Sequence, residues 1–198
     1  MWRMARKPPY DPATRREPRV PKPIDAARLD EMALAYVARF ATSAGKLADY
    51  LKRKLRERGW EGEEAPDIAA LVERFVQVGY VDDANYARSK AQGLLRRGYG
   101  ARRIDQALGA AGIAEPLREE SRGNEAERRR AAIVMARKRR FGPFGAGDRT
   151  GGDKEGRTLR EKQVAAMLRA GHPLDHVRQV VNAVSEQALE EWVDEATD

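Results

Sequence analysis

Apolar residues recur at a helical spacing from residue 25 onward, and this periodicity sets the expected fold. Over 29–40 they stand at i, i+3, i+4 and i+7, and the same spacing returns over 47–55 and 68–76. No stretch shows the strict alternation or the clustering of β-branched residues that marks a strand pair. The pattern therefore predicts an all-α protein. The aromatic residues expected in its core are Tyr36, Phe40, Tyr50 and Phe75.

Prolines and glycines mark the expected ends of these helices. Pro66, Pro116 and Pro173 stand where a helix would begin, a position at which the missing N–H costs no hydrogen bond. Ser43 and Asp82 are predicted N-caps, because their side-chain oxygens accept from the free amides of a first turn. The glycines expected just past helix C-termini, in the left-handed conformation, are Gly59, Gly79, Gly98, Gly112 and Gly171.

A short phrase of two apolar residues followed by a glycine occurs three times. Its copies are 51–59, 104–112 and 164–171, and the last, with Leu168 as its second apolar residue, is one residue shorter than the others. Each copy lies between two further helical segments. Because a three-helix unit of this size leaves an apolar edge that a neighbour must cover, the repetition predicts three tandem three-helix repeats in an elongated array.

The predicted repeats are 25–81, 82–122 and 123–187. The third contains a glycine-rich segment, 142–157, which is expected to be a flexible loop. The first helix of the third repeat, about 124–141, is rich in arginine and has a poor apolar face. An acidic C-terminal end, 188–198, is expected to follow the last repeat.

Residues 1–24 are expected to form a disordered, extended basic tail. Six of the ten prolines in the chain lie within its first 23 residues, and proline excludes helix interiors. The tail carries seven Lys or Arg against two acidic residues. A solvated arm is the simpler interpretation, and an arm that touches nucleic acid or a partner protein is the alternative.

Composition narrows the classes of protein that this chain can represent. Its 198 residues include 38 Lys or Arg and 31 Asp or Glu, a net charge of +7, so a polyanion is the first partner to test. The absence of cysteine excludes disulfides, thiolate metal sites and a cysteine nucleophile. No apolar run reaches the roughly 18 residues of a membrane span, and the N-terminus lacks the apolar core of a secretory signal. A cytoplasmic protein with no membrane contact is expected.

No group of residues indicates catalysis, a cofactor or a metal. Asp82 and Asp83 are adjacent at a helix start and point about 100° apart, so capping explains them better than shared metal binding. His172 and His176 are four residues apart but lack further zinc ligands, and surface or capping positions are expected for both. The prediction is that the protein is not an enzyme.

A longer motif spans the join between the first two repeats. It reads Gly-Tyr-Val-Asp-Asp-Ala-Asn-Tyr-Ala-Arg over 79–88, followed by Arg-Gly-Tyr-Gly over 97–100. The chain resembles the RecX family, whose hallmark is a Gly-Tyr-apolar-Asp-Asp-x-x-aromatic-Ala-Arg phrase followed by a basic-Gly-x-Gly turn. The resemblance is clear over 29–113 and holds only in outline over 124–184. The residues that carry the family motif are Gly79, Tyr80, Asp82, Asp83, Tyr86, Ala87 and Arg88.

The resemblance implies three tandem three-helix repeats in a curved, elongated monomer. It further implies binding in the groove of a RecA–DNA filament, slower ATP turnover and strand exchange, and thereby modulation of DNA repair and recombination. The implied partners are the RecA filament and DNA, single- or double-stranded, bound without sequence preference. The chain departs from the family at Lys46, where a glutamate is common, and in its glycine-rich segment and proline-rich tail.

Clusters of cations recur near corresponding positions of successive repeats. Each cluster alone is most simply a solvated face, but stacked repeats would align them into a stripe that follows phosphates. Tyr99, between two glycines, is the aromatic residue best placed for exposure. The candidate contact residues are Lys52, Arg53, Lys54, Arg96, Arg97, Tyr99, Arg102, Arg103, Arg137, Lys138, Arg139 and Arg140.

Two other functions compete with a filament modulator. A DNA-binding regulator with helix-turn-helix pairs would need a dimer interface and a palindromic site, and no heptad seam is visible in the sequence. A metal-dependent nuclease would need more ligands than Asp82 and Asp83 supply.

Overall fold

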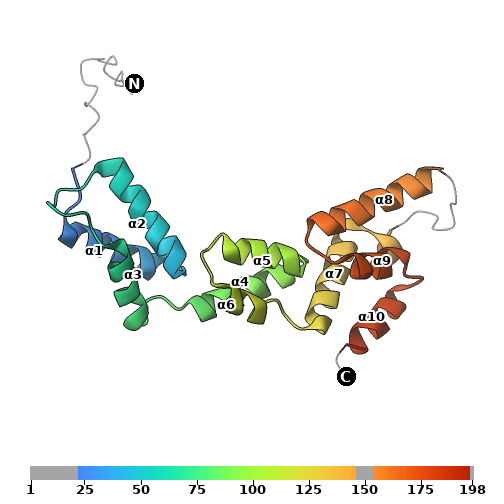
Figure 1. The fold of residues 1–198 in the computed structure, drawn as a ribbon. Helices are drawn as coiled ribbons and strands as arrows, with labels where there is room; N and C mark the ends of the chain where they lie inside the picture. Colours follow the sequence, from blue (N-terminus) through green and yellow to red (C-terminus); the bar gives the residue numbers. More distant parts are fainter. Residues whose placement is uncertain (1–21, 146–153, 197–198) are drawn as a thin grey trace, which may run out of the picture.

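The computed structural model describes residues 22–145 and 154–196, which form three consecutive groups of helices in an elongated row (Figure 1). The helices are α1 (Ala26–Arg39), α2 (Ala44–Arg58), α3 (Ile68–Gln77), α4 (Asp83–Leu95), α5 (Ala101–Gly109), α6 (Glu115–Glu120), α7 (Glu125–Arg139), α8 (Lys154–Arg169), α9 (Leu174–Asn182) and α10 (Glu186–Asp194), with a 3-10 turn, η2 (Gly142–Phe144). No β-strand occurs in the described ranges, so the predicted all-α class is confirmed.

Helices α1, α2 and α3 enclose the first hydrophobic core. The N-cap Asp25 accepts from the Arg28 amide over 2.7 Å and starts α1, whose apolar face then packs on α2 and α3. The core side chains are Leu29, Met32, Ala33, Leu47, Leu51, Leu71, Val72 and Phe75. Phe40 was expected in this core, but it follows the end of α1 and is 50% exposed.

The N-terminal end of the first group is closed by Ile24. This side chain is fully buried, and its backbone donates to the Gly59 carbonyl and accepts from the Glu61 amide, each over 3.0 Å. The predicted basic tail, 1–24, therefore ends in an ordered segment, while residues 1–21 lie outside the described part of the chain.

Helices α4, α5 and α6 enclose a second core that relies on small side chains. Ala87 and Ala91 on α4 are buried against Ile104 and Leu108 of α5, both fully buried. Ala131, which belongs to α7, joins this core, so the second and third groups share apolar contacts.

Helices α7 to α10 enclose the third core, and this group differs most from the sequence-based expectation. Although α7 is rich in arginine, it buries six residues, four of them alanines, because small side chains allow close approach. The prediction that an acidic end, 188–198, follows the last repeat is wrong. Residues Glu186–Asp194 form α10, and Leu189, Trp192 and Val193 enter the core at 0, 9 and 5% exposure.

Both ends of the predicted loop at 142–157 are helical instead. Its beginning forms η2, its end is the first turn of α8, and 146–153 lie outside the described residues.

The register of the third sequence phrase requires a correction as well. The sequence pattern predicts Leu168 as the second apolar residue of this copy, but Met167 is fully buried and Leu168 is 37% exposed. Met167 stands four residues before Gly171, as Leu108 stands before Gly112. The amides that follow these glycines bond back to Met167 and Leu108 over 3.2 and 3.1 Å. The third copy therefore has the same spacing as the second.

Successive groups meet through a recurring contact between a loop and a turn. The loop before α2 and the first turn of α2 pack on the turn after α5, where a Cβ on Gly45 would lie 2.8 Å from the Ala111 carbonyl oxygen. The loop before α5 packs on the turn after α8, where the Gly100 amide donates to the Ala170 carbonyl over 2.9 Å. As a result, α2, α5 and α8 follow one another along the same side of the row (Figure 1).

Candidate nucleic-acid interface

A basic groove of about 420 Å³ lies where the second group of helices meets the third. We define it by its five cations and one aromatic residue. These are Arg97 and Tyr99 in the turn between α4 and α5, Arg103 in α5, Lys138 and Arg139 in the last turn of α7, and Arg169 at the end of α8. The groove floor is formed by backbone and by small or apolar residues, and no carboxylate lines it.

The cations of the basic groove are available to a ligand. All five side chains belong to exposed residues, and within the described parts of the chain none of them forms an ion pair. Arg97 donates to the Gly93 carbonyl over 3.0 Å, and Lys138 donates to the Arg97 carbonyl over 3.3 Å, which leaves both positive charges uncompensated. Like charges on one concave wall raise the local positive potential and attract anions.

The chemistry of the basic groove matches a nucleic-acid strand. Guanidinium groups form charge-assisted hydrogen bonds with phosphate oxygens. Tyr99, 36% exposed, stands among the cations and presents a ring on which a base can stack. Phosphate contacts together with a stacking ring are typical of sequence-independent binding to a single strand.

The structure unites five of the predicted contact residues and separates the others. The basic groove contains Arg97, Tyr99, Arg103, Lys138 and Arg139 from that set. It also contains Arg169, which no sequence pattern indicates because this residue belongs to no cluster. Lys52, Arg53 and Lys54 lie on α2 in the first group, where Lys54 pairs with Glu57 over 2.6 Å. These three residues therefore do not contribute to the groove.

The remaining predicted cations surround the groove without lining it. Arg96 is exposed at the end of α4, and Arg102 lines two adjacent hollows, one of which it shares with Arg169. Arg137 pairs with Glu186 of α10 over 3.4 Å, and Arg140 adopts a left-handed conformation just past α7.

The family-motif residues join the first group to the second. Asp82 caps α4 by accepting from the Asn85 amide, and Asp83 accepts from the Ala44 amide at the start of α2, each over 2.8 Å. Gly79 has a positive φ of 78° after α3, and Tyr80 packs against the ring of Phe75. The other motif residues are Tyr86, which faces Lys46, Ala87, which is fully buried, and Arg88, which is exposed.

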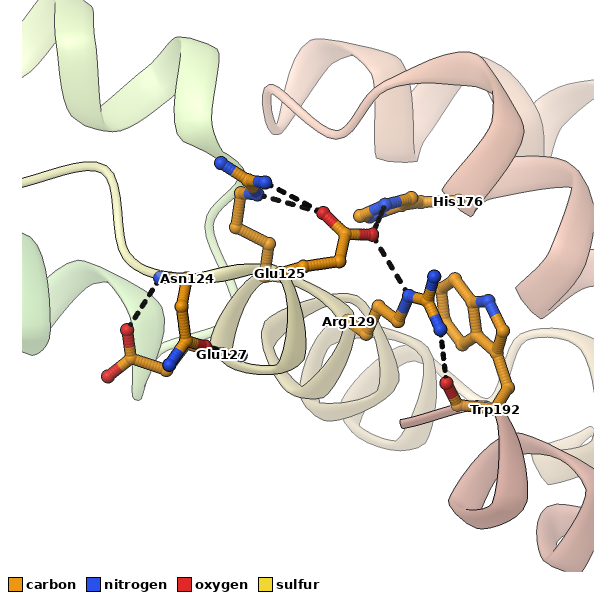
Figure 2. A network of polar contacts seen from close by, with 7 residues as sticks. Asn124, Glu125, Glu127, Arg129, His176 and Trp192 are labelled. Atoms are coloured by element: carbon orange, nitrogen blue, oxygen red, sulfur yellow. Dashed lines mark hydrogen bonds and ion pairs between the residues drawn. The ribbon is translucent and has the colours of Figure 1, made fainter. Parts of the chain in front are cut away.

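A polar network around Glu125 ties α9 and α10 to α7 (Figure 2). The Glu125 carboxylate accepts from Arg128, Arg129 and His176 over 2.7, 2.9 and 2.8 Å. Arg129 also donates to the Trp192 carbonyl of α10 and lies 4.8 Å from the centre of its indole ring. The prediction that both histidines are surface or capping residues is wrong, because His172 and His176 are 3 and 4% exposed.

The network predicts an acid-sensitive third group of helices. Burial alone would raise the pKa of Glu125, but hydrogen bonds from Arg128, Arg129 and His176 lower it to about 2. Because unfolded Glu125 binds a proton near pH 4.5, it contributes stability that is complete above that pH and is lost as the pH falls towards 2. We expect hydrogen exchange at α7 and α9 to accelerate across this window. Glu125→Gln should flatten the pH profile, and identical profiles for the two proteins would contradict this expectation.

Two other types of site are absent from the described residues. No group of three or more potential metal-ligating side chains occurs there. None of the helices in the described ranges is long and apolar enough to cross a membrane.

The fold and the basic groove define a class of protein, a row of helical domains with a cationic site at a domain junction. Comparisons with known proteins show what this chain is similar to. Residues 82–121 match the family model described as "RecX, second three-helix domain". The chain is 29% identical over 181 residues to the regulatory protein RecX of Myxococcus xanthus (strain DK1622), covering 87% of this chain and 94% of the relative.

A solved structure shows the same fold. The crystal structure of RecX from Lactobacillus salivarius superposes with a TM-score of 0.58 at 17% identity, covering 85% of this chain and 96% of that chain. The comparisons agree with the resemblance to the RecX family that the motif at 79–88 and 97–100 indicates.

Proposed function

We propose that this chain regulates the RecA recombinase by binding the RecA–DNA filament, and that it inhibits ATP turnover and strand exchange without catalysing a reaction itself. Similarity over most of the chain to a relative that is named a regulatory protein supports the regulatory role. The elongated row of helical groups supports binding along a filament, because it offers a long surface rather than a single pocket. We further propose that it acts in the cytoplasm as a monomer.

The observation that carries the DNA-binding part of the proposal is the convergence of five unpaired cations on the basic groove. A strand laid in the groove would exchange its condensed counterions for these side chains. Each phosphate neutralised on a single strand contributes about 0.7 to the salt slope of binding, so five contacts would give a slope of about 3.5. Because the groove presents cations and one ring, binding should be nearly independent of sequence.

Replacing Tyr99 should weaken binding to single strands more than to duplex DNA. Stacking of one base on an aromatic ring is worth about 1–3 kcal/mol, so Tyr99→Ala should weaken oligothymidylate binding by about 5- to 150-fold. Fluorescence anisotropy with labelled oligonucleotides measures the change. Tyr80→Ala is the matched control, because Tyr80 is 59% exposed but lies outside the groove. Equal losses in the two variants would show that Tyr99 has no special role.

Association with the filament is tested by sedimentation. RecA assembled on single-stranded DNA is pelleted with increasing amounts of the chain, and binding is read from the amount recovered with the filament. The proposal predicts saturable recovery that decreases as the salt concentration rises. The helix-turn-helix alternative predicts instead a tight complex with one duplex sequence and no enrichment on the filament.

A further inference from the structure

The basic groove exists only while the second and third groups of helices are held together. Arg97 and Arg103 come from the second group, whereas Lys138, Arg139 and Arg169 come from the third. Any change in the angle between the groups would move one set of cations away from the other. The geometry of this junction therefore decides how many phosphates one strand can contact at once.

The turn that carries Arg97 and Tyr99 is pressed against the third group. A Cβ on Gly98, whose φ is 88°, would lie 2.8 Å from the Met135 amide nitrogen of α7. The Arg102 amide donates to the Gly171 carbonyl over 3.2 Å. These contacts position the backbone of the turn. Because residues 98 and 100 are both glycine, the turn has no side chain at these positions that could form a hydrogen bond across the junction.

His172, on the opposite side of the junction, supplies this side-chain hydrogen bond. It lies in the turn between α8 and α9, is 3% exposed, and its Nε2 is 3.0 Å from the Gly98 carbonyl oxygen. Because a carbonyl oxygen only accepts, the imidazole donates through Nε2. This hydrogen bond therefore fixes the position of Gly98, the residue between Arg97 and Tyr99.

The first junction shows the same arrangement with the roles reversed. There the loop residue Ser43 is fully buried, and its hydroxyl donates to the Ala111 carbonyl in the neighbouring turn. Each junction thus has a buried side chain that donates to a backbone carbonyl across the contact. At the second junction the donor comes from the turn, because the loop has glycines where a donor would stand.

We infer that His172 is a positioning residue for the basic groove: it touches no ligand, but it holds the 97–100 turn so that cations from two helical groups face one strand. The inference rests on the proposed function of the groove. It distinguishes His172 from His176, which bonds to Glu125 inside the third group and does not reach the groove.

Two substitutions of different reach test this role. A glutamine at 172 places its amide nitrogen near the position of Nε2, whereas asparagine is too short to reach the Gly98 carbonyl. We expect His172→Gln to bind oligothymidylate within about twofold of the wild type. His172→Asn should lose about one phosphate contact, lowering the salt slope by about 0.7 and the affinity by about fivefold at 0.1 M salt.

The first junction supplies the control. Ser43→Ala loosens a junction that is remote from the groove and should leave the salt slope unchanged. A folded Asn variant with the wild-type slope, or equal losses in the Gln and Asn variants, would overturn the positioning role. If the Asn variant does not fold, Gly98→Ala perturbs the contact from the other side, and an unchanged slope there overturns it too. Wild-type protein without salt-dependent binding would overturn the proposed groove function and this inference together.

Discussion

Reversing two charges in the basic groove should remove most of the affinity of this protein for single-stranded DNA. Arg97→Glu with Arg139→Glu changes one cation in each of the two helical groups that form the groove. Losing two phosphate contacts lowers the salt slope by about 1.4 and the affinity by about 25-fold at 0.1 M salt. The new carboxylates repel phosphate, so the measured loss should exceed that figure. Fluorescence anisotropy across a salt series measures both quantities.

A matched control separates a local effect from one of net charge. Arg39→Glu with Arg178→Glu changes the total charge equally, and both residues are exposed and lie outside the groove. We expect this variant to keep nearly the wild-type salt slope, because exposed charges beyond about 8–10 Å from the strand are largely screened. Equal losses in the two double variants would show that binding follows total charge and that the groove is not a site.

Truncating Trp192 should destabilise the third group of helices and leave the first unchanged. The indole is 9% exposed, meets the His176 ring edge-on at 5.2 Å, and lies under the Arg129 guanidinium. Removing a buried tryptophan side chain costs about 3–5 kcal/mol. Because α1 to α3 enclose a separate core, the loss should remain local. Hydrogen exchange should accelerate in α7 and α9 but not in α2.

Asp194→Ala is the control on the same helix, because Asp194 is exposed and should have little effect on exchange. A Trp192→Ala variant with wild-type exchange in α7 would contradict the assignment of α10 to the third core. Equal acceleration in all three groups would contradict their separate stability.

The helix ends were predictable because they depend on local chemistry. All five glycines predicted at helix C-termini have a positive φ, between 74° and 92°. Ser43 and Asp82 cap helices as predicted. Caps and turns of this kind are set by a few neighbouring residues, so tertiary structure has little power to change them.

Packing decided the features that the sequence analysis missed. The acidic residues after 185 concealed α10, although Leu189, Trp192 and Val193 stand at the i, i+3, i+4 spacing of a buried face. The sequence does not distinguish Met167 from Leu168, because both are apolar and only the geometry of the following turn selects Met167 for the core. The histidines are buried because each finds a hydrogen-bond partner that is distant in sequence.

The basic groove was only partly predictable. Its cations were recognised as clusters, but their convergence depends on a junction between residues more than 60 positions apart in sequence, such as Arg97 and Arg169. Periodicity within one helix says nothing about the angle between two repeats. The same limit explains why Lys52, Arg53 and Lys54 lie outside the groove, although the sequence predicts that stacked repeats align their cluster with the others.

We propose that the chain restrains RecA through the basic groove, and the DNA-dependent ATPase of RecA on single-stranded DNA tests this proposal directly. The assay is titrated with wild-type protein, with the Arg97→Glu, Arg139→Glu variant and with the Arg39→Glu, Arg178→Glu control. We predict inhibition by the wild type and the control at similar concentrations, and inhibition by the groove variant only at a much higher concentration. An ATPase untouched by wild-type protein, or a groove variant as inhibitory as the wild type, would contradict the claim.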